Sequence, residues 1–320
     1  MHRMRIVAAL FLAISFSLAQ GHAQQSGPIV KLDPALDAIV PAGAQLEKLR
    51  DGFVFLEGPV WVRKGGYLLF SNMPEHAVDK WSRDGKISVY LDLTKFKKDV
   101  GPTDYLSSGT TLDPQGRLVY CSQTERAIMR IEKNGERTVL ADHYEGTQMN
   151  SPNDLVYKAN GSLYFTAPAR PPLAKLPSSV YLLKDGKLQL ITIQLSSPNG
   201  IALSPNGKIL YVNDISKKTV WAYDVQPDDM ALNPRVFLDM NSDSTVGGPD
   251  GMKVDKKGNV YDSGPGGIWI VSPEGKHLGT ILTPDRVSNL AFGDPDGKSL
   301  FITMHNELAR IRPKNEGVRP

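Results

Sequence analysis

Short apolar runs alternate with polar, glycine-containing turns along almost the whole chain. Residues 247–261 are representative: a polar entry leads into a short apolar run, a turn follows at Gly258, and a second apolar run begins after it. Runs of this length bounded by turn residues predict β-strands joined by tight turns. Residues 24–320 keep no helical period, so the pattern predicts an all-β fold.

This segment recurs six times, and each copy places an oxygen-bearing side chain eight residues before its turn glycine. The turn glycines are Gly65, Gly116, Gly161, Gly207, Gly258 and Gly297, spaced by 51, 45, 46, 51 and 39 residues. The side chains that precede them are Glu57, Ser108, Asn153, Asn199, Asp250 and Asn289. Repeats of this length, built from strands and turns, predict a six-bladed β-propeller with one four-stranded blade per repeat.

We expect residues 44–320 to form this propeller as a single domain. The last repeat supplies only three strands after Asn289, the third at residues 308–311. The fourth is expected at residues 45–50, so that an N-terminal strand closes the ring. A solenoid or a sandwich is the structural alternative, but a solenoid would need shorter or helical repeats.

The first 23 residues resemble a cleavable secretory signal. Arg3 and Arg5 form a basic start, residues 6–18 are apolar, and Gly21-His22-Ala23 offers a small-x-small cleavage site. A transmembrane anchor is the alternative, but the apolar run is too short to span a bilayer comfortably. We therefore expect export to a periplasm, with residues 24–43 as an extended lead-in to the propeller.

Composition limits the partners of the chain. Its formal net charge is +3, and removal of Arg3 and Arg5 would leave about +1. A nearly neutral mature chain gives no reason to expect nucleic acid or an anionic membrane as a partner. Cys121 is the single cysteine, so no intramolecular disulfide can form. We expect a monomer that acts on a small molecule.

The six oxygen-bearing side chains begin the innermost strands, so we expect them to converge on the axis at one face of the ring. Carboxylate and amide oxygens suit a hard cation, and Ca²⁺ accepts such ligands in tolerant geometry. Mg²⁺ or Mn²⁺ would also fit, whereas Zn²⁺ is a weaker possibility because the ring offers no His or Cys. The alternative is that these polar side chains only satisfy backbone groups at strand entries.

The loops after the second strands return to the same face. They bring Gln123, His305 and an insertion at residues 167–179 to it. Within the insertion, Arg170 and the Pro171-Pro172 pair would form a lid that contacts an anionic or hydroxylated substrate; a plain surface loop is the alternative. We take Asn153, Gln123, Arg170 and His305 as candidate substrate-binding residues.

Several ordered motifs resemble the senescence-marker-protein/gluconolactonase/luciferin-regenerating-enzyme family. They are Glu57-Gly58-Pro59-Val60-Trp61, Ser151-Pro152-Asn153-Asp154, Ser197-Pro198-Asn199-Gly200 and Pro249-Asp250-Gly251-Met252. The resemblance covers residues 45–312 and implies a six-bladed propeller, one divalent metal on the axis, and lactone hydrolysis. It implies that Glu57, Asn199 and Asp250 bind the metal. It also implies that Asn153 binds the metal or holds substrate, and that Asp250 is the catalytic base.

The chain departs from the bacterial lactonases of this family at three places on the expected active face. Ala167 stands where those lactonases usually have Asp, Ser122-Gln123 where they have Glu-His, and Asn72 where they have Asp. Each change removes charge. The resemblance therefore implies a preserved metal shell beside an altered substrate pocket.

Three functions remain open from the sequence. The leading hypothesis is a metal-dependent lactonase in which Asp250 activates water. The same ring resembles that of diisopropyl-fluorophosphatases, phosphotriester-cleaving enzymes in which the equivalent aspartate attacks phosphorus directly. The third is a non-enzymatic propeller that binds a ligand or a protein and uses the cation only structurally. Fold does not distinguish them.

Overall fold

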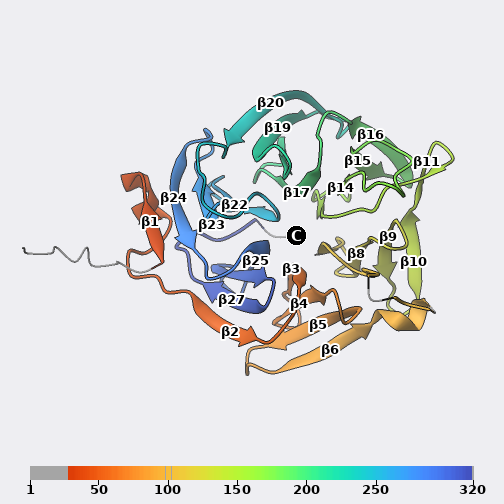
Figure 1. Ribbon diagram of the computed structural model, residues 1–320, viewed down its shortest axis with the longest axis horizontal. Coiled ribbons are helices and arrows are strands. Elements are labelled where there is room, and N and C mark those ends of the chain that lie inside the picture. The colour runs from red at the N-terminus through yellow and green to blue at the C-terminus, as the bar shows by residue number, and fades with distance from the viewer. Residues whose placement is uncertain (1–27, 98, 102, 319–320) are drawn as a thin grey trace, which may run out of the picture.

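The computed structural model describes residues 28–97, 99–101 and 103–318. The expected signal sequence, residues 1–23, lies outside this part of the chain. Six antiparallel sheets are arranged around a central axis (Figure 1), which confirms the predicted six-bladed β-propeller. Within the described ranges, no helix is long and apolar enough to cross a membrane.

The first three blades follow the sequence order of the repeats, each with its innermost strand first. Blade 1 consists of β3 (Leu56–Val62), β4 (Tyr67–Asn72), β5 (Ala77–Ser82) and β6 (Ile87–Asp92). Blade 2 consists of β7 (Thr110–Leu112), β8 (Leu118–Ser122), β9 (Ala127–Ile131) and β10 (Arg137–Ala141). Blade 3 consists of β13 (Leu155–Tyr157), β14 (Leu163–Ala167), β15 (Ser179–Lys184) and β16 (Lys187–Thr192). A small hairpin of β11 (His143–Tyr144) and β12 (Thr147–Gln148) joins blade 2 to blade 3.

The remaining blades repeat the pattern. Blade 4 consists of β17 (Pro198–Leu203), β18 (Ile209–Asp214), β19 (Thr219–Val225) and β20 (Ala231–Asp239). Blade 5 contains β21 (Met252–Val254), β22 (Val260–Gly264), β23 (Gly267–Val271) and β24 (His277–Leu282). Blade 6 contains β25 (Val287–Gly293), β26 (Ser299–Met304) and β27 (Glu307–Ile311). A short 3-10 helix, η2 (Leu93–Phe96), follows blade 1.

An N-terminal strand closes the ring, as the sequence predicts. The strand β2 (Glu47–Asp51) pairs antiparallel with β27 and becomes the fourth strand of blade 6. Glu47 lies opposite Arg310, and their side chains also form an ion pair of 2.7 Å. Blade 6 thus contains residues from both ends of the domain, so that the ring is held shut by backbone hydrogen bonds.

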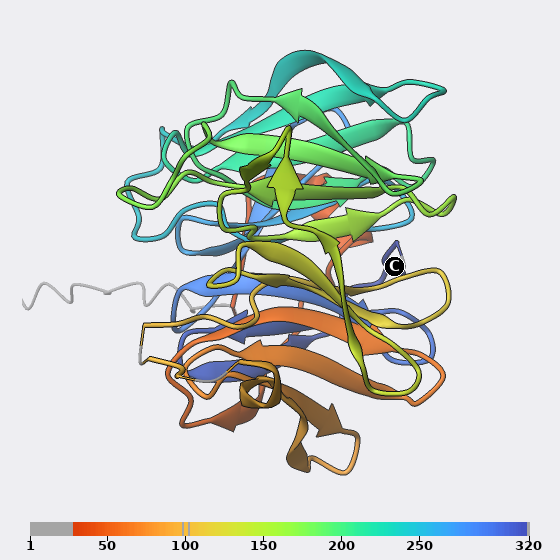
Figure 2. The ribbon, with the colours of Figure 1, turned by 90° about the vertical axis from the view of Figure 1, so that its right-hand side faces the viewer.

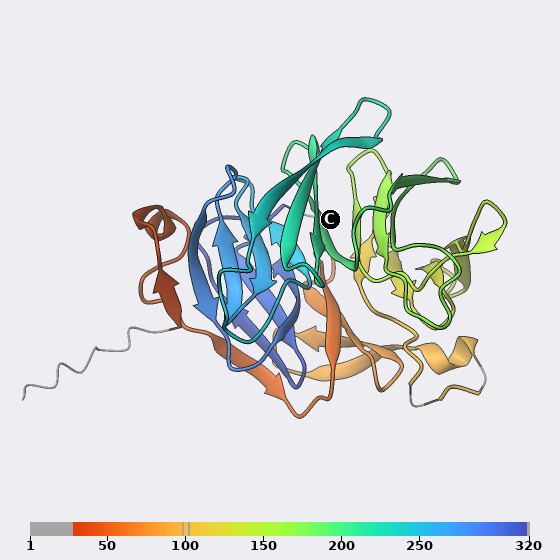
Figure 3. The same ribbon diagram turned by 45° about the horizontal axis from the view of Figure 1, so that its top comes forward.

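The segment before β2 is more ordered than an extended lead-in. Its strand β1 (Ile29–Lys31) pairs with β24 as a fifth strand of blade 5 (Figure 3), and a 3-10 helix η1 (Pro34–Ala38) follows. Leu36 of η1 is 2% exposed and packs into the core between blades 5 and 6. Gly279 permits this approach, because a Cβ there would lie 2.4 Å from the Val30 carbonyl oxygen.

The core lies between neighbouring blades. In the side view of Figure 2 the sheets lie face to face. Clusters of buried apolar side chains from adjacent sheets fill the space between them. Between blades 1 and 2, for example, Val60 and Leu69 pack with Leu118 and Tyr120. This burial fixes each blade against its neighbours and thereby fixes the innermost strands around the axis.

Candidate active site

The six side chains singled out by the repeat lie at the same end of the axis, at the start of the innermost strands. All six are at most 9% exposed. We call them the axial ring: Glu57, Ser108, Asn153, Asn199, Asp250 and Asn289. The repeated sequence position thus corresponds in every blade to a buried polar side chain near the start of the innermost strand.

Glycine follows the ring residue in four of the six blades because the next innermost strand packs against that position. A Cβ at Gly200 would lie 1.9 Å from the Asp250 carbonyl oxygen, and one at Gly251 would lie 2.2 Å from Asn289 Cγ. Gly58 and Gly109 are similarly close to the backbone of the next ring residue. Any side chain there would push two strands apart, so these glycines set the diameter of the ring.

Glu57 lies within a network of hydrogen bonds and charges. Its Oε2 accepts hydrogen bonds from the Gly58 backbone nitrogen at 2.7 Å and from Asn289 Nδ2 at 3.0 Å. Burial, followed by the negative charge of Asp154, raises the pKa of Glu57 to about 7, although these hydrogen bonds oppose the shift. A cation close to this buried carboxylate would stabilise its charged form.

Asp250 is the second carboxylate of the axial ring, and its charge interacts with that of Glu57. Burial, followed by the charge of Glu57, raises the pKa of Asp250 well above its ordinary value. Arg286, which directly precedes β25, opposes this shift, with its Nη2 at 3.5 Å from Asp250 Oδ2. The side-chain amide of Asn199 also hydrogen-bonds to Asp250. Asp250 thus combines a raised proton affinity with a fixed orientation.

The donor set of the axial ring fits a hard divalent cation. Asn199 Oδ1 is buried and has no hydrogen-bond partner among the described residues. Buried polar atoms are nearly always paired, so this carbonyl oxygen near Asp250 is free to bind a cation. Among the described residues there is no cluster of three or more His, Cys, Asp or Glu side chains that could hold a metal. A cation would instead be held by Glu57 and Asp250 together with amide oxygens, a set that suits Ca²⁺.

Asp154 and Lys253 belong to this network and were missed by the reasoning from sequence. Asp154 is 2% exposed, and its Oδ2 accepts a hydrogen bond of 3.3 Å from Asn289 Nδ2. Lys253 Nζ donates to Asn289 Oδ1 at 3.2 Å and to the Met252 carbonyl oxygen at 2.9 Å. Its positive charge lowers the pKa of both Glu57 and Asp154, against the larger effect of burial. One lysine therefore acts as an internal counter-charge for the acidic ring.

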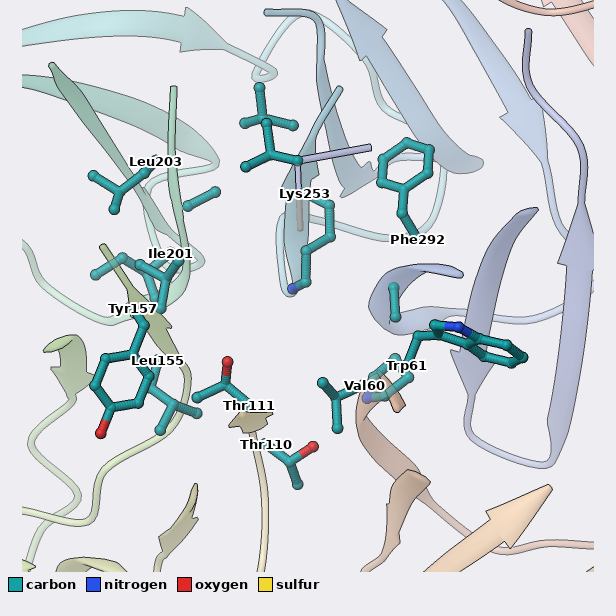
Figure 4. A pocket seen from close by; sticks show the side chains of 16 residues that line it. Val60, Trp61, Thr110, Thr111, Leu155, Tyr157, Ile201, Leu203, Lys253 and Phe292 are labelled. Atoms are coloured by element: carbon teal, nitrogen blue, oxygen red, sulfur yellow. The ribbon is translucent and has the colours of Figure 1, made fainter. Parts of the chain in front are cut away.

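Below the ring the axis becomes apolar. Figure 4 shows Lys253 pointing into a space lined by Val60, Leu155, Ile201 and Phe292. This cavity has a volume of about 70 Å³. Val318 of the C-terminal segment also lines it, and its backbone nitrogen donates to the Val254 carbonyl oxygen at 2.8 Å. The C-terminal segment up to Val318 therefore packs against the end of the innermost strand β21 that lies opposite the ring.

Two of the expected substrate-binding residues contact each other. Gln123 is 6% exposed, and its Nε2 donates to Ser108 Oγ at 2.9 Å. Its Oε1 accepts a hydrogen bond from Arg170 Nη1. Arg170 comes from the insertion between β14 and β15, and its charge interacts with those of Asp250 and Glu57. The insertion therefore brings Arg170 near the acidic ring, and its role as a lid stays a prediction.

The other two expected residues are placed differently. Asn153 is 7% exposed. Its backbone nitrogen donates to the Thr166 carbonyl oxygen, and its own carbonyl oxygen accepts a hydrogen bond from the Gly109 nitrogen. These two bonds hold Asn153 in the ring. His305 follows β26, and its ring packs edge-on against Phe55 with the centroids 4.9 Å apart. The described contacts thus place Asn153 in the ring and give His305 an aromatic neighbour on the rim.

A family model and several known proteins match this chain over most of its length. The SMP-30/Gluconolactonase/LRE-like region matches residues 55–306. A gluconolactonase of Zymomonas mobilis is 34% identical over 313 residues, covering 91% of this chain and 87% of the relative. A diisopropyl-fluorophosphatase of Loligo vulgaris is 26% identical over 277 residues, covering 79% and 86% respectively.

A solved structure is similar throughout the domain. The gluconolactonase structure from Xanthomonas campestris has a TM-score of 0.78 and 32% identity, and the match covers 89% of this chain and 94% of that one. The matched range includes all six ring residues, their turn glycines, and strands β3 to β24 of blades 1 to 5. The chain therefore belongs to the SMP-30/gluconolactonase/LRE-like family.

Proposed function

We propose that this protein hydrolyses lactones with the aid of one divalent cation, for which Ca²⁺ is the favoured ion. The cation would be held by Glu57, Asn153, Asn199 and Asp250. The orphaned Oδ1 of Asn199 beside two buried carboxylates is the observation that carries the proposal. The gluconolactonases of Zymomonas mobilis and Xanthomonas campestris support lactones as the substrate class.

The cation would polarise the lactone carbonyl and offset the negative charge that develops on its oxygen. Asp250 would take the proton of the attacking water. Without the cation, burial and the neighbouring Glu57 raise the pKa of Asp250. The charge of the cation would lower this pKa and keep Asp250 ionised, as a general base must be. Arg286, at 3.5 Å, would keep the Asp250 carboxylate oriented during proton transfer.

The remaining polar groups at the ring would bind the substrate. Gln123 and Arg170 lie against each other above the ring, where they offer donors to substrate oxygens. Asn153 would ligate the cation or hold a substrate oxygen, and His305 would contact substrate from the rim. The apolar axis below Lys253 leaves the ring accessible chiefly from the face that carries the insertion.

The proposal is tested with a panel of γ- and δ-lactones. Purified protein is stripped with a chelator and then given Ca²⁺, Mg²⁺, Mn²⁺ or Zn²⁺ in turn. We expect hydrolysis to disappear on stripping and to return with Ca²⁺ or another of these ions. Full hydrolysis by the stripped protein would overturn the role of the cation, and no hydrolysis of any lactone by a cation-loaded protein would overturn the activity.

A phosphotriesterase is the second candidate, favoured by the similarity to the squid diisopropyl-fluorophosphatase over 79% of this chain. In that case Asp250 would attack phosphorus directly rather than activate water. The two routes differ in where isotope-labelled water appears first. Label in the Asp250 carboxylate after a single turnover would favour the nucleophilic route, whereas label only in the product would favour the general base.

A further inference from the structure

Two arginine side chains stand at the mouth of the axial ring. Arg286 lies directly before β25, is 40% exposed, and approaches Asp250 to 3.5 Å. Arg170 reaches the ring from the insertion, and its Nη1 donates to Gln123 Oε1. Asp250, Tyr105 and Glu57 are the groups whose charges interact with Arg170. The Arg286 guanidinium is thus directed at Asp250, and Gln123, which also bonds the ring residue Ser108, holds the Arg170 guanidinium beside the ring.

A bound divalent cation would change the charge balance of this mouth. It would compensate Glu57 and Asp250, the two carboxylates that Arg170 and Arg286 face. Deeper in the ring, Lys253 already compensates Asp154. Among the described residues, Asp250 is the acid that pairs with Arg286, and no carboxylate lies within ion-pair distance of Arg170. With the cation bound, Arg170 would carry a positive charge with no acidic partner within ion-pair distance, and Arg286 would share Asp250 with the cation.

Guanidinium groups bind carboxylates and phosphates through paired, charge-assisted hydrogen bonds. Gln123, which holds Arg170, is uncharged, so the arginine remains available to an anion that enters from the open face. A neutral sugar lactone would only accept hydrogen bonds from the N–H groups of these side chains. An anionic lactone would use both their donors and their charge.

We propose that the preferred substrate is an anionic lactone, with a carboxylate or a phosphate remote from the lactone carbonyl, and that Arg170 and Arg286 bind this group. The inference rests on the proposed lactonase function. Hydrolysis adds one water and breaks the acyl carbon–oxygen bond, so the product is a hydroxy acid with a second acidic group. The arginines then select the substrate, while Asp250 performs the proton transfer.

The kinetic test compares one neutral and two anionic lactones on the cation-loaded protein. The probes are glucono-δ-lactone, glucaro-1,4-lactone for the carboxylate, and 6-phosphoglucono-δ-lactone for the phosphate. We expect kcat/KM to be at least about tenfold higher for one anionic lactone than for the neutral one. The anion that gives the larger ratio identifies the acidic group. A ratio at or below one for both would overturn the inference while the lactonase function stands.

Arg170 is the decisive position because it has no ion pair with Asp250. Arg170→Met should lower the ratio of anionic to neutral kcat/KM about tenfold, and Arg170→Lys, which keeps the charge, should restore part of it. Lys175→Met, which removes an exposed charge from the same insertion, should leave the ratio unchanged. An unchanged ratio in Arg170→Met would contradict the assignment.

A binding measurement tests the inference without turnover. Calorimetry compares glucarate, the open dicarboxylate, with gluconate, each titrated into wild-type protein and Arg170→Met at the same cation concentration. We expect the variant to weaken glucarate binding about tenfold and gluconate binding much less. Equal losses for both acids would overturn the anion site. If no lactone is hydrolysed, the proposed function fails, and this measurement still decides whether the arginines bind anions.

Discussion

Asn289 donates a hydrogen bond of 3.0 Å to Glu57, although 232 positions separate the two residues in the chain. The bond joins the last blade to the first at the level of the candidate cation site. The same amide nitrogen lies 3.3 Å from Asp154 of blade 3. One side chain therefore links the last blade to the first and also contacts two of the buried acidic groups.

Replacing Asn289 should disturb both stability and cation binding. Asn289→Leu has nearly the same size but removes one hydrogen-bond donor from each of two buried carboxylates, Glu57 and Asp154. We expect the free energy of unfolding of the cation-free protein to fall by about 1–3 kcal/mol, and the cation affinity to fall about 10- to 100-fold. Denaturant unfolding and calorimetry measure the two effects. Asn134→Leu, at an exposed turn, is the matched control, and unchanged cation affinity in Asn289→Leu would contradict the account.

The positive charge of Lys253 should contribute measurably to the stability of the protein. Lys253→Met keeps the length of the side chain but removes the positive charge that acts on Glu57 and Asp154. We expect a loss of about 2 kcal/mol or more in unfolding free energy, because a buried acid is left uncompensated. The double variant Lys253→Met, Asp154→Asn should lose less than the sum of the single variants. Strict additivity would show that the two charges do not interact.

The ion pairs of Asp229 should make the free energy of unfolding depend on pH. Its side chain is 1% exposed and accepts hydrogen bonds from Lys184 at 2.8 Å, from Ser162 at 2.9 Å and from Lys158. Because all three donors belong to blade 3, these bonds connect blade 4 to blade 3. Burial acts to raise the pKa of Asp229, but the lysine, Ser162 and Asn160 donors outweigh burial and hold the pKa below its ordinary value. The native state therefore binds fewer protons here than the unfolded state does.

This stabilisation should be complete above the ordinary aspartate pKa of about 4 and be lost as the pH falls further. Asp229→Asn should reduce the unfolding free energy by about 3 kcal/mol at neutral pH and should make the loss of stability in acid shallower. Denaturant unfolding of the cation-free protein between about pH 7 and pH 2 measures both. Parallel curves for wild type and variant would rule out this role for Asp229.

The fold was predictable because its signals are local and repeated. Each turn glycine follows its ring residue at a constant distance, and the closing strand could be expected because blade 6 lacked one. The strand β1 offered no comparable signal. It has three residues, of which Val30 and Lys31 are exposed, so its pairing with β24 depends on the docking of Leu36 rather than on its own pattern.

The acidic ring was only partly predictable. Neighbouring residues of a regular strand point to opposite faces, so Asp154 was not expected beside Asn153. Both residues precede β13, which begins at Leu155, and alternation does not apply there. Lys253 and Arg286 have no repeated register at all. Their roles follow from contacts with Asn289 and Asp250, which lie on other strands and are visible only in three dimensions.

The most direct test of the central claim is Asp250→Asn. Lactone hydrolysis by the cation-loaded variant is compared with that of the wild type, and calorimetry on the same preparations reports cation binding. Because Asp250 is assigned as the base, we predict a fall in kcat of about a thousandfold, with unfolding of the cation-free variant as cooperative as that of the wild type. Near-normal turnover by a folded Asp250→Asn protein would contradict the account.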